Sequence, residues 1–199
     1  MTAQPDTTLE RRAVVQALLK DRGTMLVIAG LGSAAWDVAS VEDNPLDFPM
    51  WGGMGAPAMI GLGLAQAQPG RRVLVITGDG DLMMGVGSLA TIGAQAPENL
   101  SIAVLDNERH GETGMQRGLT ASGVDIAGIA RACGFKAAYT ARGDQELEAR
   151  IKLMRQGPGL ALCVFKIKAE AVPRVLPPRD GGYLKDRFRE KLLGAAVMK

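Results

Sequence analysis

Three short apolar runs mark the predicted core of this chain. They occupy residues 25–30, 73–77 and 102–105 and consist mainly of Val, Ile, Leu and Ala, without polar alternation. Runs of this kind are typical of strands that are buried on both faces in a parallel sheet. We therefore predict that they are neighbouring strands of one sheet.

Stretches with helical character separate these runs. Residues 55–66 are rich in Ala, Met and Leu, and residues 81–95 carry apolar side chains at three- and four-residue intervals. The alternation continues with a predicted helix over 126–133, a strand over 136–139, a helix over 144–155 and a strand over 160–166. This order predicts an α/β fold, an open three-layer α/β/α sandwich with a mostly parallel sheet.

Both ends of the chain have features of their own. The Leu and Val spacing within residues 1–20 predicts an amphipathic helix, and a proline-rich connection begins at about residue 171. The last residues carry Leu184, Phe188 and Leu192 on one helical face. We expect this tail to pack back on the domain, with docking on another subunit as the alternative.

Composition limits the class of protein. The chain has 199 residues, of which 47% are hydrophobic and 22% charged, and its formal net charge is +2. This length suits one well-buried domain, so we expect a single domain over residues 1–199 with a helical tail over about 171–199. No polybasic block alternates with aromatic residues, so we expect no nucleic-acid partner.

The sequence gives no sign of a membrane or an oxidising compartment. No signal-type apolar core opens the chain, and no apolar run is long enough to span a bilayer. Cys133 and Cys163 lie far apart among apolar residues, which favours buried, reduced thiols. We expect a cytoplasmic protein without a membrane partner.

Two polar segments directly follow predicted strands. Gly78, Asp79, Gly80 and Asp81 come after the second apolar run, where glycines permit a tight turn and a helix N-terminus favours phosphate. A carboxylate would repel that phosphate unless a cation lies between them. Taken alone, this turn is also consistent with an ordinary strand-to-helix connection.

The second segment supplies a partner for such a cation. Asn107 ends the third apolar run, 28 positions after Asp79 (107 − 79), which leaves room for one helix and one strand. Ligands bind at the carboxyl ends of the strands in open α/β sheets, so both residues are expected at adjacent strand ends. Magnesium takes oxygen ligands and commonly joins carboxylates to phosphate oxygens.

These residues resemble the cofactor motif of thiamine diphosphate (ThDP) enzymes. The motif consists of Gly78–Gly80 followed by an apolar strand that ends at Asn107, and the segment LDNERHGETGMQ is similar to that of phosphonopyruvate and sulfopyruvate decarboxylases. The resemblance covers roughly residues 26–163 and implies the diphosphate-binding domain of the family. The commonest motif has two asparagines, but Asp106 takes the first place here, as those decarboxylases tolerate.

The resemblance implies the ligands of the cofactor. Asp79 and Asn107 would bind Mg²⁺ through their side chains and Arg109 through its backbone carbonyl, while the backbone near Gly80 and Asp81 would contact the diphosphate. Met54 would be the bulky residue that supports the bent cofactor. The other cofactor-facing positions would be Gly30, Ser33, Gly53, Gly78 and Gly111.

The loop after Asn107 holds the candidates for substrate and proton chemistry. His110 is the one histidine of the chain, and we consider it a candidate for proton transfer or for binding a substrate anion. Glu112, Thr113 and Gln116 share the loop. Arg109 and Arg117 are candidates for attracting an anionic head group, although a solvated basic loop would have the same composition.

The resemblance also implies that a second protein is needed. In the family, the glutamate that activates the cofactor belongs to a separate pyrimidine-binding domain, and 199 residues leave no room for one. We therefore expect a pyrimidine-binding α subunit, an α₂β₂ or larger assembly, and a small anionic 2-oxoacid as substrate. The expected reaction is decarboxylation of a 3-sulfo- or 3-phosphono-pyruvate-like acid.

Two alternatives are open from the sequence. One is a subunit of another ThDP enzyme, either an acetolactate-synthase-like carboligase or a 2-oxoacid oxidoreductase. Two isolated cysteines cannot hold the iron–sulfur clusters of the latter, which would then have to lie on another subunit. The other is a non-catalytic nucleotide-binding module. The chain lacks both GxGxxG at its first strand-to-helix turn and GxxxxGK[ST], which argues against that module.

Overall fold

A computed structural model describes residues 9–198. It contains a six-stranded sheet in the order β2-β1-β3-β4-β8-β7, in which every pairing is parallel. The strands are β1 (Leu26–Ala29), β2 (Asp47–Pro49), β3 (Val73–Gly78), β4 (Leu100–Asp106), β7 (Ala137–Ala141) and β8 (Ala161–Lys166). The predicted α/β class with a mostly parallel sheet is confirmed.

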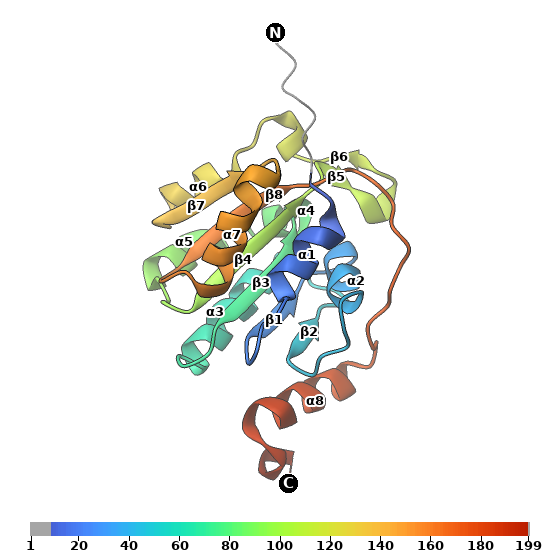
Figure 1. The fold of residues 1–199 in the computed structure, drawn as a ribbon, viewed down its shortest axis with the longest axis vertical. Coiled ribbons are helices and arrows are strands. Elements are labelled where there is room, and N and C mark those ends of the chain that lie inside the picture. The colour runs from blue at the N-terminus through green and yellow to red at the C-terminus, as the bar shows by residue number, and fades with distance from the viewer. Residues whose placement is uncertain (1–8, 199) are drawn as a thin grey trace.

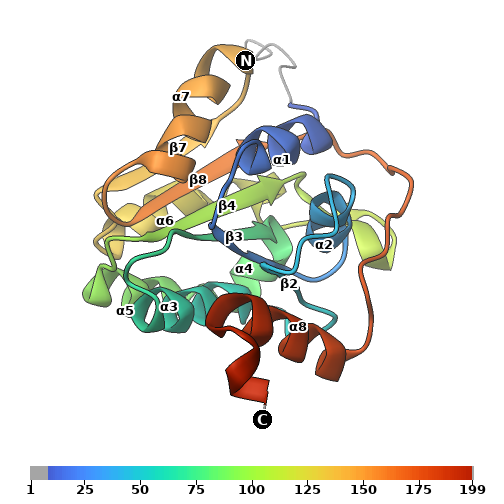
Figure 2. The same cartoon turned by 60° about the horizontal axis from the view of Figure 1, so that its bottom comes forward.

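Helices cover both faces of this sheet, as Figures 1 and 2 show. One face carries α1 (Arg11–Leu19), α2 (Ser33–Ala39) and α7 (Asp144–Gln156). The other carries α3 (Pro57–Ala67), α4 (Asp79–Met84), α5 (Ser88–Gln95) and α6 (Ile126–Ala132). The molecule therefore has the three layers that the alternating sequence pattern predicts.

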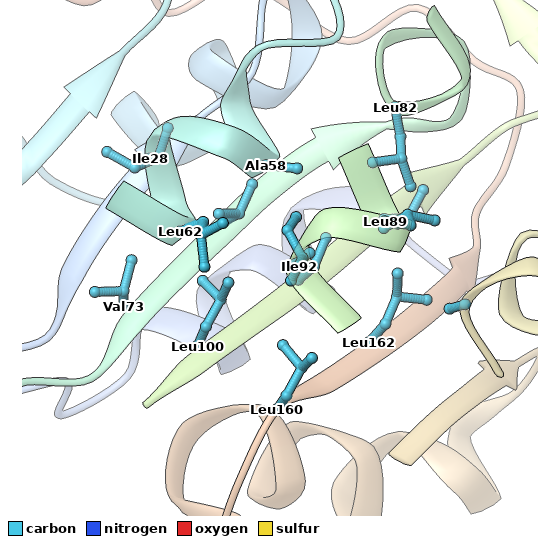
Figure 3. Close-up of a cluster of buried hydrophobic side chains, with 14 of the residues drawn as sticks. Ile28, Ala58, Leu62, Val73, Leu82, Leu89, Ile92, Leu100, Leu160 and Leu162 are labelled. Carbon is cyan, nitrogen blue, oxygen red and sulfur yellow. The ribbon is translucent and has the colours of Figure 1, made fainter. Parts of the chain in front are cut away.

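Two apolar cores hold the layers together, one on each face of the sheet. Successive residues of one strand contribute to opposite cores because their side chains point to opposite faces. In β1, for example, Ile28 joins the core under α3 and α5, whereas Val27 joins the core under α1 and α7. Figure 3 shows Ile28 in the first core with Leu62, Leu89 and Ile92 of the covering helices.

One helix expected from the sequence is divided in two. The predicted helix over 81–95 is α4 and α5 instead, with a break at Gly85–Gly87. The cause is a close backbone contact, because a Cβ at Gly85 would lie 2.2 Å from the carbonyl oxygen of Gly55. The chain turns here to admit the loop before α3, which the apolar periodicity does not reveal.

Short elements without periodicity were also absent from the prediction. They are the edge strand β2 and a two-stranded hairpin of β5 (Arg109–His110) and β6 (Gln116–Arg117). Two or three residues are too few to display an apolar alternation. The hairpin matters for function because it carries the loop after Asn107.

The helices nearest to the two ends of the described part of the chain both pack on the domain. Helix α1 buries Val14, Val15 and Leu18, while residues 1–8 of the predicted N-terminal helix lie outside the described residues. The tail forms α8 (Gly181–Leu193), and the rings of Phe48 and Phe188 meet edge to face with centroids 5.7 Å apart. The tail helix therefore covers the edge strand β2, as Figure 1 also shows.

The predicted environment of the thiols is correct for one cysteine only. Both cysteines are free, but Cys163 is buried in β8, whereas Cys133 is half-buried at the end of α6. Burial raises the pKa of Cys163 to about 12, so this thiol stays protonated. Within residues 9–198, no helix combines the length and apolar character needed to cross a bilayer.

Candidate cofactor site

A cavity of about 410 Å³ opens at the carboxyl ends of β1, β3 and β4. The chain passes from β1 to β2 on one side and then to β3 on the other, so the order of strands changes direction here. Such a switch point leaves a crevice between the diverging connections. The cavity is lined by Arg11, Leu31, Ser33, Ala34, Met54, Gly78, Asp79, Gly80, Asp81, Met84, Leu105, Asn107, Arg109, His110, Gly111, Glu112, Thr113 and Ile167.

Asp79 is the buried carboxylate of this cavity. It begins α4 directly after β3, and its side chain is only 3% exposed. Burial, and secondarily the negative charge of Asp106, raises the pKa of Asp79 to about 6. Two carboxylates close together in a buried site repel each other, and a bound cation relieves that repulsion.

A chain of polar contacts continues from Asp79 behind the cavity. The hydroxyl of Thr120 lies 3.0 Å from Oδ2 of Asp79 and 2.9 Å from Oδ1 of Asp106. On the other side of Asp106, Nζ of Lys166 donates to Oδ2 at 2.9 Å and also to Oε1 of Glu108 at 2.5 Å. Thr120 therefore holds Asp79 directly at the cavity wall, and Asp106, Lys166 and Glu108 hold Thr120 in place from behind.

Asn107 lies where β4 ends and the loop begins. Its Oδ1 accepts a hydrogen bond from the backbone N–H of Arg109 at 3.0 Å. Glu108 between them adopts a positive φ of 61°, and its carbonyl accepts from the N–H of Gly118 at 2.8 Å. This tight turn directs the hairpin back over the cavity.

Asp81 ties three segments together at the floor of the cavity. Its Oδ2 accepts from the hydroxyl of Thr77 at 2.7 Å, and its Oδ1 accepts from the backbone N–H of Gly55 at 2.7 Å. Gly30 packs directly against it, because a Cβ at this position would lie 2.2 Å from Oδ2 of Asp81. Gly30 is therefore not part of the cavity lining. A glycine is needed at this position because a larger residue would collide with Asp81.

Some of the remaining predicted positions line the cavity, and one lies beside it. Ser33, Met54 and Gly111 line the cavity, whereas Gly53 does not and instead has a positive φ of 74° in the loop before α3. The hydroxyl of Ser33 donates to Oε1 of Glu112 at 3.2 Å, which connects the start of α2 to the hairpin loop. Met54 is 38% exposed, so an apolar side chain is available at the cavity mouth.

Two cationic candidates of the loop have different surroundings. Arg109 lines the cavity, and within residues 9–198 its guanidinium makes no hydrogen bond or ion pair. Arg117 lies outside the cavity lining and donates to the carbonyl of Ala121 at 2.7 Å.

His110 lies against the start of α4, since a Cβ at Gly80 would be 2.9 Å from its ring.

The donor set fits magnesium bound together with a phosphate group. Asp79 and Asn107 offer a carboxylate and an amide oxygen on one cavity, and both are hard oxygen ligands. Among the described residues, no three His, Cys, Asp or Glu side chains form a metal-binding group. A complete octahedron therefore needs oxygen atoms from backbone, water or a bound phosphate.

Several residues of the site escaped the sequence analysis. Thr120 and Lys166 hold the carboxylates behind the cavity, while Arg11 and Ala34 line it. Lys166 leaves one signal in the sequence, because a lysine that ends an apolar strand run lies at the same edge of the sheet as Asn107. Thr120 leaves none, since it belongs to an irregular connection.

Comparison with known proteins agrees with this geometry. A family profile described as "Thiamine pyrophosphate enzyme, C-terminal TPP binding domain" matches residues 31–165. The chain is 35% identical to sulfopyruvate decarboxylase subunit beta of Methanothermobacter thermautotrophicus over 94% of this chain and 97% of the relative.

Other relatives are longer than this chain. Phosphonopyruvate decarboxylase of Streptomyces viridochromogenes is 40% identical over 67% of this chain, and the match spans 34% of that protein. The chain thus spans about a third of this relative and 47% of the enzyme of Streptomyces hygroscopicus. In fold, the chain is similar to benzoylformate decarboxylase of Polynucleobacter necessarius, with a TM-score of 0.66 and 22% identity over 87% of this chain and 36% of that one.

Proposed function

Since the chain belongs to the family of C-terminal TPP-binding domains of thiamine pyrophosphate enzymes, we propose that it is the diphosphate- and Mg²⁺-binding subunit of a two-subunit 2-oxoacid decarboxylase. The observation that carries this proposal is one cavity at the strand ends that is lined by both Asp79 and Asn107. Thiamine pyrophosphate and thiamine diphosphate are the same cofactor.

The chain's own residues hold and orient the cofactor in this proposal. Asp79 and Asn107 bind Mg²⁺ through side-chain oxygens and Arg109 through its carbonyl, while the backbone at Gly80 and Asp81 contacts the diphosphate. Support comes from the burial of Asp79 and from its contact with Thr120, which fixes the carboxylate in advance. Met54 supports the cofactor from the cavity mouth.

The reaction releases CO₂ from a 2-oxoacid and gives an aldehyde. When bound, the cofactor supplies the electron sink for the bond that breaks. His110 holds or moves a proton near the start of α4, a role that its position against Gly80 supports.

The substrate class is a pyruvate with an anionic group at C3. The named relatives act on sulfopyruvate and phosphonopyruvate, and sulfonate and phosphonate are both oxyanions. Arg109 provides a guanidinium on the cavity wall that has no partner among the described residues and suits such a group. A plain pyruvate would leave this charge without a partner.

The glutamate that activates the cofactor comes from outside these 199 residues. The name of the archaeal relatives, subunit beta, supports a partner subunit. We propose a pyrimidine-binding α subunit and an α₂β₂ or larger assembly in which the cofactor lies between the chains.

The test is an assay of the complex purified from its own source with Mg²⁺ and thiamine diphosphate. Release of CO₂ from sulfopyruvate or phosphonopyruvate well above that from pyruvate is expected. Asp79→Ala and Asn107→Ala should abolish it, and Asp186→Asn on α8, outside the cavity lining, should not. A complex that carries the cofactor but decarboxylates none of these acids would refute the proposed activity.

A further inference from the structure

A second cavity lies at the opposite end of the sheet. Its volume is about 180 Å³, and it is formed where the chain enters β1 and β3 and where α7 ends. The cofactor cavity lies at the carboxyl ends of these strands, so the body of the sheet separates the two. The second cavity is lined by Asp21, Arg22, Thr24, Met25, Gly70, Arg71, Arg72, Arg155 and Gln156.

Four arginines and one carboxylate surround this small space. Arg22 is paired with Glu42 and Asp47, so the excess of positive charge around the cavity comes from Arg71, Arg72 and Arg155, which only Asp21 of the lining opposes. Within residues 9–198, the guanidinium groups of Arg71 and Arg155 make no hydrogen bond or ion pair. Like charges gathered in this way repel each other unless an anion joins them.

Arg72 is held in place without a carboxylate. It donates to the carbonyls of Met154 at 3.2 Å, Leu153 at 3.4 Å and Glu98 at 3.4 Å, and to the hydroxyl of Ser101. Burial lowers the pKa of Arg72 because its charge has lost part of its hydration. The guanidinium is thus fixed beside the cavity, while no carboxylate of residues 9–198 forms an ion pair with it.

Arg22 has an unused donor at the same place. Its side chain is 3% exposed, and it pairs with Asp47 through Nη1 and with Glu42 through Nε. The Nη2 atom is buried and has no hydrogen-bond partner. A buried donor without a partner among the described residues is costly, which marks this side of the cavity as polar and incompletely satisfied.

From this arrangement we propose that the cavity is a binding site for a small oxyanion of the phosphate and sulfonate class. Guanidinium groups recognise tetrahedral oxyanions through paired hydrogen bonds, and the cavity is too small for a nucleotide. Asp21, the one carboxylate in the lining, opposes the anion and limits its affinity. The site is independent of cofactor binding and of the decarboxylase activity.

The test is a titration of inorganic phosphate and sulfate, followed by calorimetry and by the melting temperature. Saturating Mg²⁺ and thiamine diphosphate fill the cofactor cavity throughout, and sodium chloride keeps the ionic strength constant. Phosphate and sulfate should bind and raise the melting temperature, whereas acetate should do so less. Substitution of Arg71 or Arg155 by alanine should weaken phosphate binding about tenfold each, the equivalent of one charge-assisted hydrogen bond.

Two matched variants separate this site from general charge effects. Arg189→Ala removes an exposed arginine on α8, outside the cavity lining, and should leave phosphate binding unchanged. Asp21→Asn removes the negative charge that opposes the anion and should strengthen phosphate binding. Asparagine tolerates the positive φ of 48° at this position. Equal binding by the wild type and the Arg71→Ala/Arg155→Ala variant, or a response that sodium chloride reproduces, would overturn the proposal.

If the chain does not bind thiamine diphosphate, the arginine variants still decide the question, because they lie at the other end of the sheet from Asp79. Loss of phosphate binding in these variants supports the site whatever the outcome of the decarboxylase assay. Loss of phosphate binding only in Asp79→Ala would assign the anion to the cofactor cavity and overturn the proposal.

Discussion

Lys166 and Asp106 are paired residues of β8 and β4, and Nζ of the lysine lies 2.9 Å from Oδ2 of the aspartate. Both side chains are at least nine-tenths buried. Asp106 also stands where the commonest ThDP motif has an asparagine. The lysine therefore compensates the charge that the aspartate introduces behind the cofactor cavity.

Removal of the lysine should destabilise the fold. Lys166→Met leaves Asp106 buried and without its cation, and breaking a buried ion pair in this way costs about 3–5 kcal/mol. Chemical denaturation measures the loss of unfolding free energy. The control, Lys185→Met, breaks the exposed pair with Asp186 and should cost less than about 1 kcal/mol; equal losses in both variants would contradict the compensating role.

Thr120 should act on cofactor affinity through Asp79. Thr120→Val keeps the shape of the side chain but removes the hydroxyl between the two carboxylates. We expect about 10- to 100-fold weaker Mg²⁺-dependent cofactor binding, the usual effect of losing a group that orients a metal ligand. Calorimetry measures this, with Thr140→Val in β7 as control; unchanged affinity in Thr120→Val would remove Thr120 from the site.

Gly30 and Gly63 form a matched pair of glycines for a steric test. Gly30→Ala should lower stability by about 1–3 kcal/mol, because the new Cβ would overlap Oδ2 of Asp81 and force that side chain to move. Gly63→Ala in α3 has open space and should stabilise the helix by about 0.5–1 kcal/mol. Chemical denaturation of both variants measures whether each substitution raises or lowers the unfolding free energy. Stabilisation by Gly30→Ala would contradict the close packing of Gly30 against Asp81.

Asp47 gives a prediction for the dependence of stability on pH. Burial raises its pKa to about 6 in the folded chain, although Arg22 opposes the shift, whereas the unfolded value is about 3.9. The folded state therefore binds more protons between these values, so the contribution of Asp47 to stability is complete below about pH 4 and is lost as the pH rises through about 6.

Melting temperatures of the wild type and Asp47→Asn across this range isolate the effect, because asparagine does not titrate. The wild type should lose stability relative to the variant as the pH rises from about 4 to about 6, and the difference should then stay constant. A difference that grows in favour of the wild type over this range would show that the ion pair with Arg22 outweighs burial.

The sequence predicts the parts of this protein that repeat a pattern. The apolar runs locate β1, β3, β4 and β8, and with them the strand ends at which Asp79 and Asn107 lie. Of the twelve residues predicted as cofactor, metal or catalytic residues, ten line the cavity, and the exceptions, Gly30 and Gly53, are glycines that shape the backbone beside it. Of the further loop candidates, Glu112 and Thr113 line the cavity, whereas Gln116 and Arg117 do not.

What the sequence does not predict depends on contacts between distant segments. The contact of Gly55 with Gly85 divides one predicted helix, and Thr120 reaches Asp79 from 41 positions away. No local periodicity encodes either contact. The arginines of the second cavity likewise come from two separate connections and from the last turn of α7, so their clustering appears only in the folded chain.

Titration of thiamine diphosphate into the purified complex, with Mg²⁺ or with EDTA, tests the central claim most directly. The account predicts binding that requires Mg²⁺ and is lost in both Asp79→Asn and Asn107→Ala, while Asp186→Asn binds like the wild type. Asp79→Asn retains the size of the side chain, so loss of binding reports the missing charge. Binding that is unaffected by EDTA or by these substitutions would contradict the assignment of the cavity as the Mg²⁺–diphosphate site.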